Sequence, residues 1–123
     1  MSVQLVKFHG LGNDYLVLNP RDYPGQLTPE RIRFICDRHY GAGSDGLLLG
    51  PLPANGGAFG LKIFNPDGSE AEKSGNGLRI FARYLWEQNL VGEARFEVLT
   101  AGGQVYCQVF AEGEMVRVEM GSA

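Results

Sequence analysis

The stretch 74–77, with the sequence Ser-Gly-Asn-Gly, holds the residue types and spacing best suited to chemistry. It lies between a turn sequence at 65–69 and a helical pattern at 78–89. We expect its two glycines to adopt backbone angles that other residues avoid, so that successive N–H groups converge where the helix begins. Such a point attracts an anion. A side chain at Ser74 would then stand beside a carboxylate or phosphate.

Two other polar turns could contribute side chains to such a site. Asn13 follows two glycines in a short connection between strand patterns, where it could face a ligand or simply cap a turn. In the turn at 65–69, Pro66 presets its own backbone angle and Gly68 accepts a positive φ. Asn65 and Asp67 can close local hydrogen bonds there.

Length, composition and charge indicate one globular domain spanning residues 1–123. The net charge is −3, and the Lys and Arg residues are scattered, which argues against a nucleic-acid partner. No apolar run is long enough to cross a bilayer, and the N-terminus lacks the pattern of a secretion signal. We therefore expect a cytoplasmic location and no membrane partner.

Two sequence features could suggest a dinucleotide site and a disulfide or metal site, but the surrounding sequence argues against both. The segment 41–46 matches the spacing G-x-G-x-x-G, but a helical pattern precedes it and an apolar strand follows it, the reverse of a dinucleotide-binding fingerprint. Cys36 falls in a helical pattern and Cys107 in a strand pattern, with neither disulfide-framework nor metal-ligand spacing. We predict that both are buried thiols.

The remaining pattern predicts the scaffold that positions these residues. One helix is capped by Thr28 and ended by Gly41, a turn-rich connection covers 51–58, and the helix at 78–88 has apolar residues around most of its circumference. Strand patterns occupy residues 3–8, 15–18, 47–49, 59–64, 96–99, 104–110 and 115–120. Because short turns join most neighbours, we predict an α+β fold, a mainly antiparallel curled sheet wrapped around the second helix, which should be the most buried.

Four motifs in register resemble the diaminopimelate epimerase family over essentially the whole chain. They are His9-Gly10-Leu11-Gly12-Asn13-Asp14, the run from Asp37-Arg38-His39 to Gly43-Ser44-Asp45-Gly46, Phe64-Asn65-Pro66-Asp67-Gly68-Ser69, and Gly75-Asn76-Gly77 with Arg79. The resemblance implies a protein of two similar halves with the active site in the cleft between them. This chain resembles the N-terminal half, so its partner would be a second epimerase domain or another copy.

The resemblance also implies a reaction and a set of site residues. The family epimerises LL-diaminopimelate to the meso form, for lysine and peptidoglycan precursors, by two-base proton transfer without pyridoxal phosphate, metal or other cofactor. Asn13, Asn65, Gly75 and Asn76 would contact the amino-acid substrate, with the amides of Gly75 and Asn76 on its α-carboxylate. Ser74 occupies the position of the family's first catalytic cysteine.

Ser74 leaves two classes of function open. A thiol titrates near ~8.5, and a helix N-terminus lowers that value, whereas a serine hydroxyl is far less acidic and needs an adjacent base. Lys73 and Glu72 are the nearest candidates, and neither is an evident base. The chain is then an epimerase half that is inactive alone with Ser74, or a non-catalytic amino-acid-binding or assembly module of the same fold. An engineered inactivation, a natural non-epimerising relative and an enzyme that uses serine are all compatible with the sequence.

Overall fold

A computed structural model of the chain describes residues 5–10, 13–22, 27–37, 45–54, 58–72, 74–111 and 115–120. Within these ranges the side chains of 5–14, 22, 76 and 120 are outside the description. Of the predicted features, the first two residues of the strand at 3–8 and positions 38–44 also lie outside it.

One sheet contains all eight strands of the described chain. The strands are β1 (Leu5–Gly10), β2 (Asn13–Leu18), β3 (Gly46–Pro53), β4 (Phe59–Phe64), β5 (Glu70–Ala71), β6 (Phe96–Thr100), β7 (Gly103–Phe110) and β8 (Met115–Met120). Their order is β1-β2-β3-β4-β6-β7-β8, with β5 paired to β4 alone. The pairs β2–β3 and β4–β6 are parallel and the others are antiparallel, so the mainly antiparallel sheet is confirmed.

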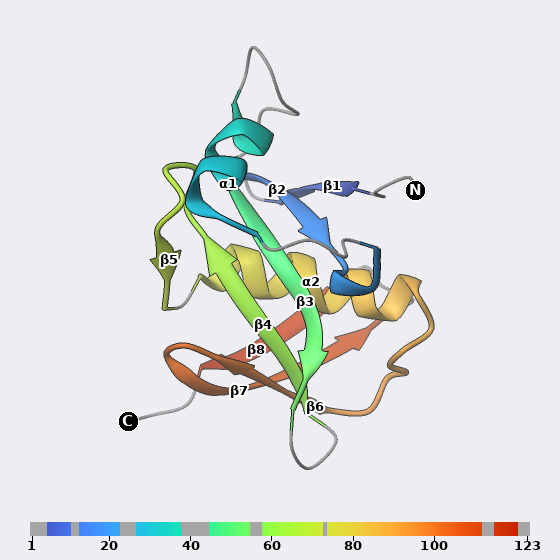
Figure 1. The fold of residues 1–123 in the computed structure, drawn as a ribbon. Coiled ribbons are helices and arrows are strands. Elements are labelled where there is room, and N and C mark those ends of the chain that lie inside the picture. Colours follow the sequence, from blue (N-terminus) through green and yellow to red (C-terminus); the bar gives the residue numbers. More distant parts are fainter. Residues whose placement is uncertain are drawn as a thin grey trace.

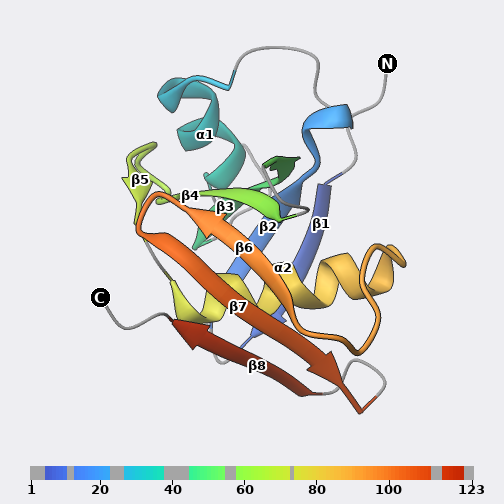
Figure 2. The same cartoon turned by 90° about the horizontal axis from the view of Figure 1, so that it is seen from below.

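The two α-helices lie on opposite faces of this sheet. Helix α1 (Pro29–Cys36) packs on the outer face through a small cluster formed by Leu16, Leu18, Ile32, Cys36 and Leu47. Helix α2 (Gly75–Glu87) lies in the concave face, with β1 and β2 on one side and β7 and β8 on the other (Figures 1 and 2). A short 3-10 helix, Pro20–Asp22, follows β2.

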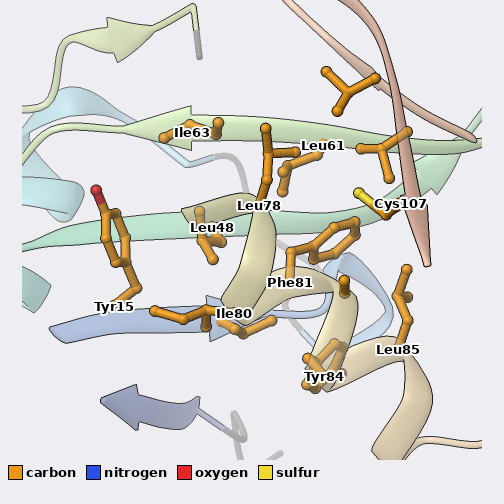
Figure 3. Packing of buried hydrophobic residues seen from close by; sticks show 14 of the residues in the cluster. Tyr15, Leu48, Leu61, Ile63, Leu78, Ile80, Phe81, Tyr84, Leu85 and Cys107 are labelled. Atoms are coloured by element: carbon orange, nitrogen blue, oxygen red, sulfur yellow. The ribbon is translucent and has the colours of Figure 1, made fainter. Parts of the chain in front are cut away.

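The alternation along the strands divides their side chains between these two layers. Residues one apart point to opposite faces, so Val17 faces α2 while Leu16 and Leu18 face α1. On α2 itself, Leu78, Phe81 and Leu85 are each 0% exposed. Figure 3 shows them inserted between the strands. The prediction that this helix is the most buried, with the sheet wrapped around it, is confirmed.

The start of α2 and the end of α1 differ from the sequence-based expectation. Helix α2 begins at Gly75 instead of Leu78, because Ser74 caps it and so compensates for two glycines of low helix propensity. Helix α1 ends at Cys36, before the predicted Gly41, since Asp37 already has extended backbone angles.

The sheet also contains more strand than predicted. Strand β3 continues through the supposed connection to Pro53, where a register shift between Leu49 and Leu52 accommodates Pro51. Strand β5 has only two residues, too few for a periodic signal. It forms because the turn at 65–69 folds the chain back on β4.

The central position of Phe81 predicts a large loss of stability on truncation. Phe81→Ala should lower the free energy of unfolding by about 3–5 kcal/mol, because it removes a fully buried ring from a packed core. Chemical denaturation would measure this loss. Phe34→Ala is the matched control, since Phe34 is 60% exposed and its loss should change stability little. Equal effects of the two substitutions would contradict the wrapped-helix core.

Candidate active site

Ser74 is the N-cap residue of α2. Its backbone is extended, with φ −151° and ψ 116°, and its side-chain Oγ accepts a hydrogen bond from the Gly77 N–H at 3.0 Å. Its carbonyl oxygen accepts from the Leu78 N–H at 2.9 Å. The first N–H groups of a helix have no intrahelical acceptor, so this cap leaves the amides of Gly75 and Asn76 available at the positive end of the helix.

The expected reason for the two glycines in this stretch is wrong. Gly75 and Gly77 lie in the first turn of α2, and the glycines with positive φ in the described chain are Gly68 and Gly103. The converging amides therefore come from an ordinary helix N-terminus. What Gly77 supplies is space, because a Cβ there would lie 3.2 Å from Leu48 Cδ2 and 3.2 Å from Ser74 Oγ.

Gly75 differs from Gly77 in its surroundings. A Cβ built on Gly75 meets no atom within 4 Å among those described, and the residue is exposed. Neither backbone strain nor packing inside the described structure requires glycine at this position. The open space beside its N–H is where an external group could approach the start of α2.

Tyr15 is a member of the site that the sequence analysis missed. Its hydroxyl lies 3.0 Å from Ser74 Oγ, and the two residues are 59 positions apart in the chain. The alternation of β2 predicts which face Tyr15 occupies, but a sequence pattern does not tell which residue a distant phenol contacts. Ser74 Oγ is thus held by groups from α2 and β2 together.

The sheet brings the backbones of the predicted site residues to one end. Tyr15 on β2 pairs with Gly46 on β3, and Leu47 pairs with Phe64 on β4. Asn13 begins β2 and Asn65 directly follows β4, so both lie at the end of the sheet where Ser74 contacts Tyr15. The structure describes only the backbones of Asn13 and Asn76, so a cavity shared with their side chains stays a prediction.

A hydrogen-bond chain fixes the side chain of Asn65. The Ser69 hydroxyl donates to Asp67 Oδ1 at 2.6 Å, because a carboxylate can only accept, and it accepts from Asn65 Nδ2 at 3.0 Å. The amide oxygen of Asn65 therefore points away from Ser69, and the residue is exposed. The predicted positive φ of Gly68, at 93°, and the local bonds of Asn65 and Asp67 are confirmed.

The two cysteines lie away from Ser74 in function and setting. Cys36 and Cys107 are both buried, as predicted, and desolvation by burial raises the pKa of Cys107 to about 12. A thiol of that pKa stays protonated at neutral pH. Among the described residues, no three His, Cys, Asp or Glu side chains gather as a metal site, and no helix is long and apolar enough to span a membrane.

A surface groove lies apart from the predicted site residues. It is formed by β3, β4 and the start of the β6–β7 hairpin, and its lining is Leu52, Pro53, Ala54, Gly60, Leu61, Lys62, Glu70, Leu99, Thr100 and Ala101. It is a concave, partly apolar surface of the kind expected for a chain that packs on another half. Whether anything packs there stays a prediction.

The curled sheet around a helix is also found in the solved structures of a racemase and an epimerase. The superposition on a probable proline racemase from Agrobacterium radiobacter covers 95% of this chain and 41% of the racemase chain, with a TM-score of 0.70 and 20% identity. A hydroxyproline epimerase from Agrobacterium vitis matches 89% and 38%, with a TM-score of 0.66 and 19% identity. At such identities the likeness shows the fold alone.

Sequence comparison identifies the family within that fold. The family described as diaminopimelate epimerase matches residues 5–123. Diaminopimelate epimerase 2 of a Nostoc species is 59% identical over 97% of this chain and 42% of its own, and the Nitrosomonas eutropha diaminopimelate epimerase is 44% identical over 98% and 44%. The chain belongs to the diaminopimelate epimerase family, and it spans less than half the length of these relatives.

The network around Asp67 predicts a pH-dependent contribution to stability. Hydrogen bonds from Ser69 hold the pKa of Asp67 below its ordinary value of 3.8, with Arg33 adding to the effect. A carboxylate whose pKa is lower in the folded state than in the unfolded state stabilises the fold at a pH above its unfolded-state pKa. That stabilisation is lost as the pH falls through the folded-state pKa. The stability difference between the wild type and Asp67→Asn should therefore shrink on acidification below about pH 4. Urea unfolding across the acid range measures it.

Ser69→Ala provides the matched variant for this prediction. It removes the hydroxyl that is the first cause of the low pKa, so the carboxyl of Asp67 should titrate at higher pH in an NMR titration. An unchanged Asp67 titration in Ser69→Ala would show that the network does not hold the carboxylate.

Proposed function

We propose that residues 1–123 are a single domain, the N-terminal half of a two-domain amino-acid epimerase that acts on diaminopimelate or a closely related amino acid. The supporting observation is the placement of Ser74 as the N-cap of α2 in a chain whose family match covers residues 5–123. In this proposal, position 74 is that of the family's first catalytic cysteine. A second epimerase domain, or another copy of the chain, would complete the cleft.

The proposed substrate site follows from the start of α2. The N–H groups of Gly75 and Asn76, at the positive end of the helix dipole, would bind the α-carboxylate. Asn65 would offer its amide oxygen as an acceptor for an N–H donor of the substrate, since Ser69 occupies its amide nitrogen. Asn13 would complete the contacts from the start of β2. Neutral amides and dipoles suit a zwitterion, which needs no net charge from the site.

The proposed reaction moves one proton on each face of the α-carbon. A base on one face takes the α-proton, the electron pair stays on the substrate, and an acid on the other face returns a proton with inverted configuration. No cofactor or metal takes part in this proposal. The side chain at position 74 serves one face, beside the Gly77 N–H and the helix dipole, both of which stabilise an anion there.

Ser74 also supports a second candidate function. Ser74 is already used as a cap, and serine is among the best N-cap residues, worth about 1 kcal/mol over alanine. A structural role therefore accounts for its hydroxyl without any reaction. On this alternative the chain is a non-catalytic binding or assembly module that kept the fold and the carboxylate site but lacks the thiol.

Ser74→Cys, made in a chain that also carries a second epimerase domain, separates the two functions. It should raise α-proton exchange by about 10²- to 10⁴-fold while hardly changing substrate affinity, because only the transition state needs the base. Deuterium incorporation at the α-carbon of both diaminopimelate stereoisomers, followed by NMR, measures it. Ser74→Ala is the control that keeps the site but offers no acid or base.

Each outcome of that experiment has a distinct meaning. Exchange by the Ser74 protein as fast as by Ser74→Cys would make serine a competent base here. Binding of diaminopimelate without exchange by either protein would favour the binding module. Neither binding nor exchange would overturn the assigned substrate.

Gly75→Ala tests the carboxylate contact separately from the fold. The added methyl group meets open space within the domain and alanine is the better helix former, so the free energy of unfolding should be unchanged or raised by up to about 1 kcal/mol. Diaminopimelate affinity should fall, because the methyl group crowds the amides that hold the carboxylate. Isothermal titration and denaturation measure the two effects. An undiminished affinity would place the carboxylate elsewhere.

A further inference from the structure

We propose that Tyr15 is the positioning residue of this site, which holds the side chain at position 74 in its reactive orientation and, when that side chain is a thiol, favours its ionised form. The inference rests on the proposed function for the role of residue 74. Its physical basis is the 3.0 Å contact between Tyr15 and Ser74 Oγ. Through it, a phenol on the sheet determines where a side chain at the helix end points.

Two groups from separate elements define the position of Ser74 Oγ. The Gly77 N–H reaches it from α2 and the Tyr15 hydroxyl reaches it from β2. Tyr15 is only 9% exposed, and its ring belongs to the core cluster around α2. Figure 3 shows the ring at one end of this cluster with its oxygen directed away from the apolar side chains. The core therefore fixes the phenol, and the phenol fixes residue 74.

Gly46 lies against both Tyr15 and the backbone of β4, since a Cβ there would be 2.9 Å from the Phe64 carbonyl oxygen. It pairs with Tyr15 across the parallel β2–β3 ladder, and a Cβ on Gly46 would lie 2.5 Å from Tyr15 Cε1 and 2.9 Å from Cδ1. Atoms cannot approach so closely, so any side chain at position 46 would displace the ring. This glycine ends the G-x-G-x-x-G spacing of the sequence, and the structure gives it a purpose unrelated to nucleotides.

The chemistry of position 74 sets the direction of the hydrogen bond. With serine, either oxygen can be the donor. A thiolate carries no proton and can only accept, so the Tyr15 hydroxyl must then donate, beside the Gly77 N–H. A donor to the charged form lowers the pKa of a thiol. Tyr15 would thus act on the reaction through residue 74 without touching the substrate.

The test uses Ser74→Cys in a chain that also carries a second epimerase domain. It measures the pKa of the introduced thiol from the pH dependence of its alkylation by iodoacetamide. Peptide mass spectrometry separates it from the other thiols. Adding Tyr15→Phe should raise this pKa by about one to two, since a hydrogen bond to a charged group is worth about one to two pKa units. Phenylalanine keeps the ring, so the core stays filled.

Tyr84→Phe is the matched control. Tyr84 is also a buried tyrosine of the same cluster, and its hydroxyl accepts a hydrogen bond from Asn19 at 3.4 Å, far from the chemistry proposed here. Its loss should leave the thiol pKa unchanged. The nearest charged residues in the sequence, Glu72, Lys73 and Arg79, are the same in every variant and cannot produce a difference between them.

Gly46→Ala supplies an independent variant, because it displaces the Tyr15 ring while keeping its hydroxyl, and it should raise the thiol pKa in the same direction. In the Ser74 protein, Tyr15→Phe should also reduce the hydrogen-exchange protection of the Gly77 amide several-fold relative to Tyr84→Phe. A thiol pKa and a Gly77 protection that do not respond to Tyr15→Phe overturn the proposal. No substrate is needed, so the result can be read even if the epimerase proposal fails.

Discussion

The burial of α2 in the concave face of the sheet is the constraint on which the rest of the structure depends. Leu78, Phe81 and Leu85 have no exposed surface, and strands from both ends of the sheet order pack against the helix. A helix held this way cannot slide or turn without opening cavities in its core. The packing of the core therefore fixes the position of the first turn of α2. The polar groups around Ser74 are thus positioned by apolar contacts about one to three turns along the helix.

Under the proposed function, the start of α2 would combine two demands that favour different residues. As a helix cap, position 74 favours a hydroxyl, because it accepts a short hydrogen bond from the Gly77 N–H. As an acid or base beside a substrate, the same position favours a thiol, whose pKa is within reach of neutral pH. The same surroundings suit both residues. The Gly77 N–H and the Tyr15 hydroxyl can donate a hydrogen bond to a serine oxygen or to a thiolate, and the helix dipole additionally stabilises the thiolate. In that proposal, residue 74 affects both the stability of α2 and the proton transfer.

Local patterns predicted much of this fold, and distant contacts limited the rest. The apolar circumference at 78–88 is a property of neighbouring residues, so it predicted the buried helix directly, and the turn chemistry of Gly68 and Asp67 was equally local. Strand β5 and the extension of β3 exist only because another strand lies beside them, which no short window contains. The contact between Tyr15 and Ser74 was missed for the same reason. The sequence predicted available amides at the start of α2 but attributed their geometry to glycine angles, whereas an ordinary helix N-terminus provides it.

The mixed order of strands has a consequence for how the chain folds. Its antiparallel hairpins, such as β6–β7, join residues close in sequence, and closing such short loops costs little chain entropy. The parallel pairs β2–β3 and β4–β6 are each bridged by a segment containing a helix, and the link from Tyr15 to Ser74 spans 59 positions. Non-local pairings of this kind are the slow events of folding. We therefore expect the end of α2 that carries Ser74 to be completed late in folding, after the hairpins.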